Sequence, residues 1–167
     1  MERDDIEPYH SFIDKLIEDA PQLKKLPLFF SHFDLNEMNV LVADEGEISG
    51  IVDWELALEQ LFGIDCSAIH FLAGETVNKK FGEKTAYEAM ERGFWNALMG
   101  AINPEIRSVL ESNVQAIQTS VMIGTLFKVV SIEEEKVFIS QIVLIRYRIP
   151  ALRGTARPYS GGLGPIT

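Results

Sequence analysis

One short segment, residues 31–39, constrains what this chain can form more than any other part of the sequence. It carries His32, Asp34 and Asn39 in the pattern H-x-D-x-x-x-x-N, directly after the apolar run Leu28–Phe30. Residues two apart in an extended segment point to the same side, so we expect the side chains of His32 and Asp34 to share one side of a loop. The loop therefore gathers an imidazole, a carboxylate and an amide within a few residues.

The loop continues into a predicted β-hairpin. The β-rich runs Asn39–Val42 and Ile48–Val52 flank a polar, glycine-containing turn, which is typical of two antiparallel strands. Asp53 follows the second run directly. Because the strands of a hairpin run back along each other, we expect the carboxylate of Asp53 to lie beside Asp34 and Asn39.

These residue types suit phosphoryl transfer. That reaction needs a carboxylate to orient or deprotonate the attacking hydroxyl, and hard oxygen ligands for Mg²⁺ between the phosphates. Asp34, Asn39 and Asp53 supply both. A simpler interpretation stays open for each residue alone, because Asp and Asn commonly satisfy main-chain groups in turns and Asp53 also stands at the end of a strand.

At these residues the sequence resembles the aminoglycoside phosphotransferase/choline kinase-like family, which has a protein-kinase-like fold. The resemblance covers roughly residues 5–150 and is strongest over 31–55, where the loop, the hairpin and the motif V-D-W-E occur together. The segments ISGIVDWE (48–55) and LFGI (61–64) are most similar to fungal-type members.

The resemblance implies a role for each motif residue. Asp34 would be the catalytic base, and Asn39 and Asp53 would bind Mg²⁺ with ATP. His32 would hold the loop to the metal-binding segment. The implied reaction is ATP- and Mg²⁺-dependent phosphoryl transfer to a hydroxyl of a small molecule.

Two positions depart from the family pattern. Phe33 stands between His32 and Asp34, where the family often has glycine, although protein kinases carry a large residue there. The acidic residue that often follows the second motif has no clear counterpart: Asp65 is a candidate for it, and a helix N-cap explains Asp65 equally well.

The residues before the motif differ from those of a complete kinase of this family. Only 31 residues precede His32, they contain no Gly-rich phosphate loop, and Lys15, Lys24 and Lys25 lie on or just after a predicted helix. We therefore expect the C-terminal lobe alone of a kinase-like fold. A second hypothesis follows, in which the chain is a non-catalytic, pseudokinase-like binding or regulatory module, or a truncated remnant.

The pattern of apolar residues predicts an α+β, mainly helical fold with a small β-hairpin at the loop. We expect a buried strand at 28–30 and a kinase-like domain over 1–150, followed by a flexible tail over 151–167 that is rich in Gly and Pro. Helices are predicted over residues 4–20, 65–73, 85–102, 104–130 and 133–148.

Charge narrows the choice of partners. The chain has 15 Lys and Arg against 25 Asp and Glu, a net charge of −10. This balance argues against nucleic acid and anionic membranes and is compatible with a cationic substrate. Without a signal peptide or a membrane span, a cytoplasmic protein is expected. Apolar groups near Phe29, Phe30 and Trp54 would be left uncovered in a single lobe, which predicts a possible dimer through that surface.

Overall fold

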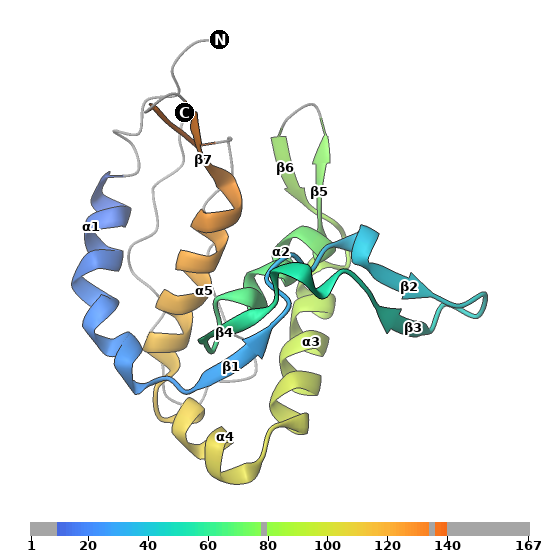
Figure 1. Cartoon of the computed structure of the whole chain (residues 1–167), viewed down its shortest axis with the longest axis horizontal. Helices are drawn as coiled ribbons and strands as arrows, with labels where there is room; N and C mark the ends of the chain where they lie inside the picture. The colour runs from blue at the N-terminus through green and yellow to red at the C-terminus, as the bar shows by residue number, and fades with distance from the viewer. Residues whose placement is uncertain (1–9, 78–79, 134–135, 140–167) are drawn as a thin grey trace.

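A computed structural model describes residues 10–77, 80–133 and 136–139. Figure 1 shows the helices and short two-stranded sheets that these residues form. In chain order the elements are α1 (His10–Asp19), η2 (Ala20–Lys25), β1 (Leu28–Ser31), η3 (Glu37–Asn39), β2 (Val40–Val42), β3 (Ile48–Ile51), η4 (Trp54–Leu56), β4 (Leu58–Leu61), η5 (Asp65–Ser67), α2 (Ala68–Ala73), β5 (Gly74–Val77), β6 (Lys80–Glu83), α3 (Tyr87–Ala101), α4 (Pro104–Glu111), α5 (Val114–Val129), β7 (Val130–Glu133) and β8 (Lys136–Ile139), where η denotes a 3₁₀-helix.

The sheets are small and antiparallel. The described strands pair as β1–β4, β2–β3, β5–β6 and β7–β8. In β2–β3, Val40 faces Ile51 and Leu41 faces Gly50, and the register shifts after Leu41. This is the predicted hairpin after the loop, and it extends away from the helices (Figure 1). The mainly helical α+β class is confirmed, whereas the assignment to one lobe of a kinase-like fold stays a prediction.

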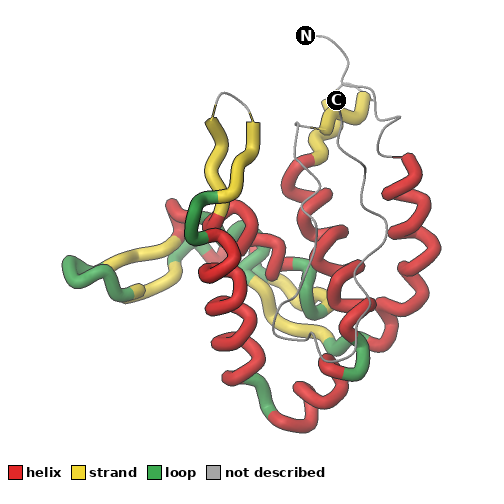
Figure 2. Tube along the Cα trace, turned by 180° about the vertical axis from the view of Figure 1, so that it is seen from behind, coloured by secondary structure: helices red, strands yellow, loops and turns green. Residues whose placement is uncertain are grey.

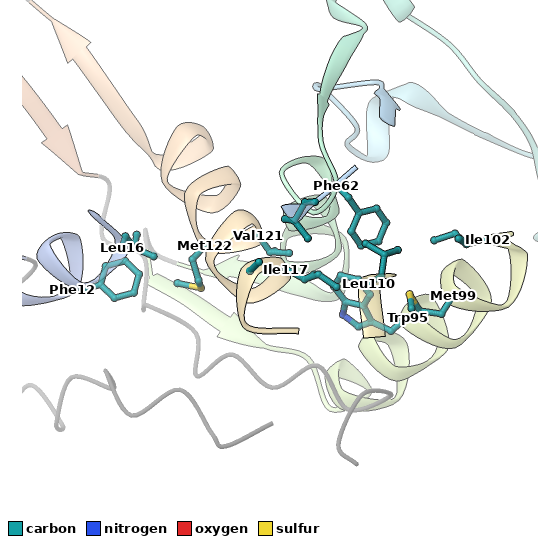
Figure 3. Packing of buried hydrophobic residues seen from close by; sticks show 12 residues of the cluster. Phe12, Leu16, Phe62, Trp95, Met99, Ile102, Leu110, Ile117, Val121 and Met122 are labelled. Atoms are coloured by element: carbon teal, nitrogen blue, oxygen red, sulfur yellow. The ribbon is translucent and has the colours of Figure 1, made fainter. Parts of the chain in front are cut away.

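Helices from both ends of the described chain form the core. In α1 the side chains of Phe12 and Leu16, four residues apart, are buried, and α1 lies alongside α5 (Figures 1 and 2). Figure 3 shows the core continuing from these residues through Met122 to the fully buried indole of Trp95. The β1–β4 sheet joins the same core through Phe29, whose ring lies edge-on to that of Phe62 at 5.1 Å. The loop between β1 and β2 therefore follows a strand that is anchored to the core through Phe29.

Several predicted helices are found with shifted ends. Residues 85–102 form α3 (87–101), and 65–73 form η5 and α2, ending at Gly74 as expected. Of the predicted helix 4–20, residues 10–19 form α1 and the first six residues lie outside the described chain. None of the described helices is long and apolar enough to cross a membrane.

The prediction of one continuous helix over 104–130 is wrong, because the helix is interrupted at Ser112 and Asn113. Ser112 Oγ donates to the carbonyl oxygen of Ser108 at 2.8 Å, and Asn113 Nδ2 donates to that of Val109 at 2.8 Å. These side chains satisfy the last carbonyl groups of α4 and so compete with continuation of the helix. The start of α4 is as predicted, since Asn103 Oδ1 accepts the Glu105 N–H at 2.8 Å.

The prediction of a helix over 133–148 is also wrong where the structure describes it. Residues 130–133 and 136–139 are the antiparallel strands β7 and β8. The sequences VSIE and KVFI are rich in β-branched and aromatic residues, a composition that favours strands. Residues 140–148 and the predicted tail 151–167 lie outside the described chain.

The prediction of a buried strand at 28–30 is wrong, because Phe29 is only half-buried against the core and its two neighbours are exposed. Leu28 is 61% exposed and Phe30 is 67% exposed. Phe30 stacks on the half-exposed ring of Trp54 with centroids 6.2 Å apart. The expected uncovered apolar surface is thus present at Phe30 and Trp54, while Phe29 faces the core. Dimerisation through this surface stays a prediction.

Glu91 is a buried carboxyl group on α3. Its side chain is 7% exposed, and burial, followed by repulsion from Glu83 and Glu88, raises its pKa from an ordinary 4.5 to about 7. The folded chain therefore holds this proton more tightly than the unfolded chain does. Stability due to the protonated carboxyl is present below pH 4.5 and is lost as the pH rises towards 7.

We expect Glu91→Gln to raise the melting temperature by about 3 °C or more at pH 8 and much less at pH 5, because the amide cannot ionise. Thermal unfolding followed by circular dichroism at both pH values measures this difference. Glu111→Gln, at an exposed position of α4 that is not among the groups raising the pKa of Glu91, is the control and should change the two temperatures equally. An equal shift at both pH values in Glu91→Gln would contradict the prediction.

Candidate active site

The loop between β1 and η3 folds around the main-chain oxygen of Asp34. Asn39 Nδ2 donates to this oxygen at 2.8 Å and Asn36 Nδ2 donates to it at 3.1 Å. Asn36 Oδ1 also accepts the N–H of Met38 at 2.9 Å, which caps η3. The turn-forming interpretation of Asn39 is therefore correct for its amide nitrogen. Because that nitrogen is engaged, the amide oxygen of Asn39 is the atom left to bind a ligand.

His32 connects the loop to the residue before Asp53. Its Nε2 lies 2.7 Å from the carbonyl oxygen of Val52, and since a carbonyl oxygen only accepts, Nε2 carries the proton. The imidazole is buried, with its ring edge-on to that of Trp54 at 4.8 Å. Val52 N–H in turn donates to the Asn39 carbonyl at 3.0 Å. His32, Asn39 and the segment leading to Asp53 thus form one connected group.

Two residues of this region, Phe33 and Asp53, have a left-handed backbone. Phe33 has φ of +68° and Asp53 has φ of +62°. Only glycine adopts this conformation freely, and other residues pay roughly 1–2 kcal/mol for it. Phe33 therefore occupies a position where the backbone suits glycine, as the family resemblance implies. Asp residues tolerate the left-handed region better than most, which fits the residue found at 53.

Asp65 forms a hydrogen bond with the left-handed main chain of Phe33. Its Oδ2 accepts the N–H of Phe33 at 3.2 Å. The predicted role of Asp65 as a helix N-cap is wrong, because it lies inside η5 and the position before it, Ile64, is the N-cap. The carboxylate instead spans from the start of the helical region to the loop.

An open cleft of about 780 Å³ lies beside the loop. Its lining includes residues 33–37 of the loop, together with Phe71, Lys84 and Lys128. The exposed side chain of Asp34 lines this cleft. The structure therefore places Asp34 in the lining of this cleft, whereas His32, Asn39 and Asp53 are not among its lining residues.

The cleft also contains residues that sequence reasoning missed. Lys84 Nζ donates to the carbonyl oxygen of Leu72 at 3.3 Å. Lys128 Nζ lies 3.7 Å from Asp65 Oδ1, and burial lowers its pKa while the carboxylates of Asp65 and Asp34 act in the opposite direction. No motif signals either lysine, because each reaches the cleft from a helix or hairpin far along the chain.

The comparison with protein families gives one match. The sequence profile of the phosphotransferase enzyme family matches residues 2–90, which is more than half of the chain. The chain belongs to this phosphotransferase family. No curated protein and no solved structure matches it significantly.

The extent of the match places the site within the phosphotransferase segment. The loop, the hairpin β2–β3, Asp53 and Asp65 all lie within residues 2–90. Helix α5 and its residue Lys128 lie outside the matched segment, although Lys128 lines the same cleft as Asp34. The matched segment therefore contains the motif residues and most of the cleft lining, and only Phe127 and Lys128 of that lining lie outside it.

Proposed function

We propose that this phosphotransferase transfers the γ-phosphoryl group of ATP, with Mg²⁺, to a hydroxyl group of a small molecule. The observation that carries the proposal is the connected group formed by His32, Asn39 and the segment leading to Asp53, with Asp34 beside it at the wall of an open cleft. A carboxylate next to an amide and a second carboxylate is the set of groups that phosphoryl transfer uses.

The donor atoms fit a magnesium ion. Mg²⁺ in such sites is held by one or two carboxylates together with substrate phosphates and water. Asp53 offers an exposed carboxylate that does not cap the following turn, and Asn39 offers its amide oxygen. Within the described ranges no group of three or more His, Cys, Asp or Glu could hold a metal by itself, so phosphate oxygens and water would have to complete the coordination of the ion. When bound, the ion would neutralise negative charge on the phosphate oxygens.

Asp34 is proposed to act on the acceptor. Asp34 lines the cleft, where its carboxylate would accept the proton of the attacking hydroxyl and orient the oxygen. His32 would fix the distance between this loop and the segment of Asp53 through its contact with Val52. Because its Nε2–H is used in that contact, His32 serves as a positioning residue in this proposal.

The finer assignment to the C-terminal lobe of a kinase-like fold, in a fungal-type member, is also proposed. It rests on the segments 48–55 and 61–64 and on the absence of a nucleotide-covering strand-turn-strand in residues 10–31, which form α1, η2 and β1. The lobe that covers ATP would then come from another segment or chain. We propose a cytoplasmic site of action, where ATP is available, and a cationic acceptor, which the net charge of −10 favours.

Titration with Mg²⁺-ATP tests this proposal. Calorimetry should give a dissociation constant between about 1 μM and 1 mM, the usual range for enzyme substrates. Asp53→Asn should remove the dependence of binding on Mg²⁺, because it removes the charged ligand while keeping a residue that tolerates the left-handed backbone.

Asp44→Asn, in the exposed turn of the hairpin β2–β3, is the matched control and should bind like the unchanged chain. Absence of binding at several millimolar nucleotide would rule out autonomous ATP use by this chain. Unchanged metal dependence in Asp53→Asn would remove Asp53 from the metal site.

A further inference from the structure

The end of α5 brings a partly buried cation to the candidate active site. The side chain of Lys128 is 19% exposed and that of its partner Asp65 is 16% exposed. Lys128 Nζ lies 5.9 Å above the centre of the Phe71 ring and 3.7 Å from Asp65 Oδ1. A charge pair so far out of water has few alternative partners, so each member depends on the other.

Asp65 also contacts the loop, through its second carboxylate oxygen. While Oδ1 faces Lys128, Oδ2 accepts the N–H of Phe33 at 3.2 Å. That N–H belongs to the left-handed residue directly before Asp34. A left-handed phenylalanine persists only when its surroundings hold it, and the bond from Asp65 is the contact on its main chain that does so.

Tight packing fixes the position of Lys128. Gly124, one helical turn before it, touches the main chain of Ile64 so closely that a Cβ atom would overlap the carbonyl group. Ile64 is the neighbour of Asp65 in sequence. The helix therefore cannot move away from or towards the carboxylate without disturbing this contact.

From this geometry we propose that Lys128 is a positioning residue of the active site, acting through Asp65 on the Phe33 peptide and so on the direction of Asp34. The inference rests on the proposed function for the role of Asp34. It extends the site to α5, which lies outside the segment matched by the family. Small displacements of a catalytic group lower the rate strongly, so a support of this kind affects the rate more than substrate binding.

Amide exchange of Phe33 tests the support directly, without nucleotide. In Lys128→Met we expect the Phe33 amide of the full chain, measured by NMR, to exchange about tenfold faster, the change that corresponds to loss of one ordinary hydrogen bond. Lys128→Arg should restore the slow exchange. Lys84→Met is the matched control, because Lys84 lines the same cleft but donates to a main-chain carbonyl.

The outcomes separate this inference from the proposed function. In a phosphoryl-transfer assay, Lys128→Met should lower kcat while leaving KM for ATP within about threefold. If the unchanged chain transfers no phosphate, the proposed function fails, but the exchange of the Phe33 amide still decides the role of Lys128.

The inference is overturned if the Phe33 amide exchanges no faster in Lys128→Met than in Lys84→Met. It is also overturned if amides throughout α3 exchange faster by the same factor as Phe33, because the effect would then not be specific to the loop. If Lys128→Met does not fold, Lys128→Gln, which keeps a polar group near Asp65, replaces it. The same two results for amide exchange would then overturn the inference.

Discussion

Asp34→Asn is expected to lower kcat for phosphoryl transfer by about 10²- to 10⁴-fold, the usual contribution of a positioned general base. The expectation is specific because the loop uses the main-chain oxygen of Asp34, which Asn39 and Asn36 both bind. The carboxylate itself accepts only a longer bond from Asn36, at 3.3 Å. Replacing it by an amide therefore removes the base and leaves the path of the loop intact.

The measurement is initial-rate transfer from Mg²⁺-ATP to a panel of hydroxyl acceptors, including aminoglycosides, choline and sugars. Asp44→Asn removes a carboxylate from an exposed hairpin turn and is the matched control. The melting temperature of Asp34→Asn should stay within about 1 °C of the unchanged chain, since surface substitutions rarely exceed about 0.5 kcal/mol. A kcat reduced less than threefold would show that Asp34 is not the base.

Gly124→Ala is expected to destabilise the fold by about 3 kcal/mol or more, which is the upper range for forced overpacking. A Cβ atom at Gly124 would overlap the carbonyl oxygen of Ile64, and neither is a flexible side chain that could move aside. Both belong to the main chain of packed elements, α5 and the segment that leads into η5. The helix would have to separate from that segment.

Urea unfolding at equilibrium measures the loss. Gly93→Ala is the matched control, because Gly93 is also inside a helix but has nothing within 4 Å of its Cβ position. There the alanine should stabilise the chain by up to about 1 kcal/mol through its better helix propensity. If Gly124→Ala unfolds at the same urea concentration as Gly93→Ala, the close approach of α5 to Ile64 does not exist.

The local part of the site could be predicted from the sequence. The loop at 31–39 and the hairpin up to residue 52 follow from turn residues and β-rich runs that are neighbours in the chain. The contacts of His32 with Val52 and of Asn39 with Asp34 bridge short separations within this unit. The role of each motif residue still depends on the proposed function.

The rest depends on contacts between distant residues. In α5 the seven consecutive residues 116–122 are all buried, so buried positions occur on every side of the helix, and the sequence shows no single apolar face that would reveal its neighbours. The break before α5 depends on whether Ser112 and Asn113 bond to their own helix or to water, and a pattern of apolar residues does not decide that. No sequence motif marks Lys128 as a residue of the site. Its position follows from the contact between Gly124 and Ile64, which only the folded structure shows.

Three of the contacts that hold the loop join a side chain to main-chain atoms. His32 binds the carbonyl oxygen of Val52, Asn39 that of Asp34, and Asp65 the N–H of Phe33. Main-chain atoms are present whatever residue occupies a position. The side chains that face the cleft, such as Leu35 and Leu56, are therefore free to change over evolutionary time without moving the loop. A site built in this way can acquire preferences for new acceptors while its chemistry is inherited intact.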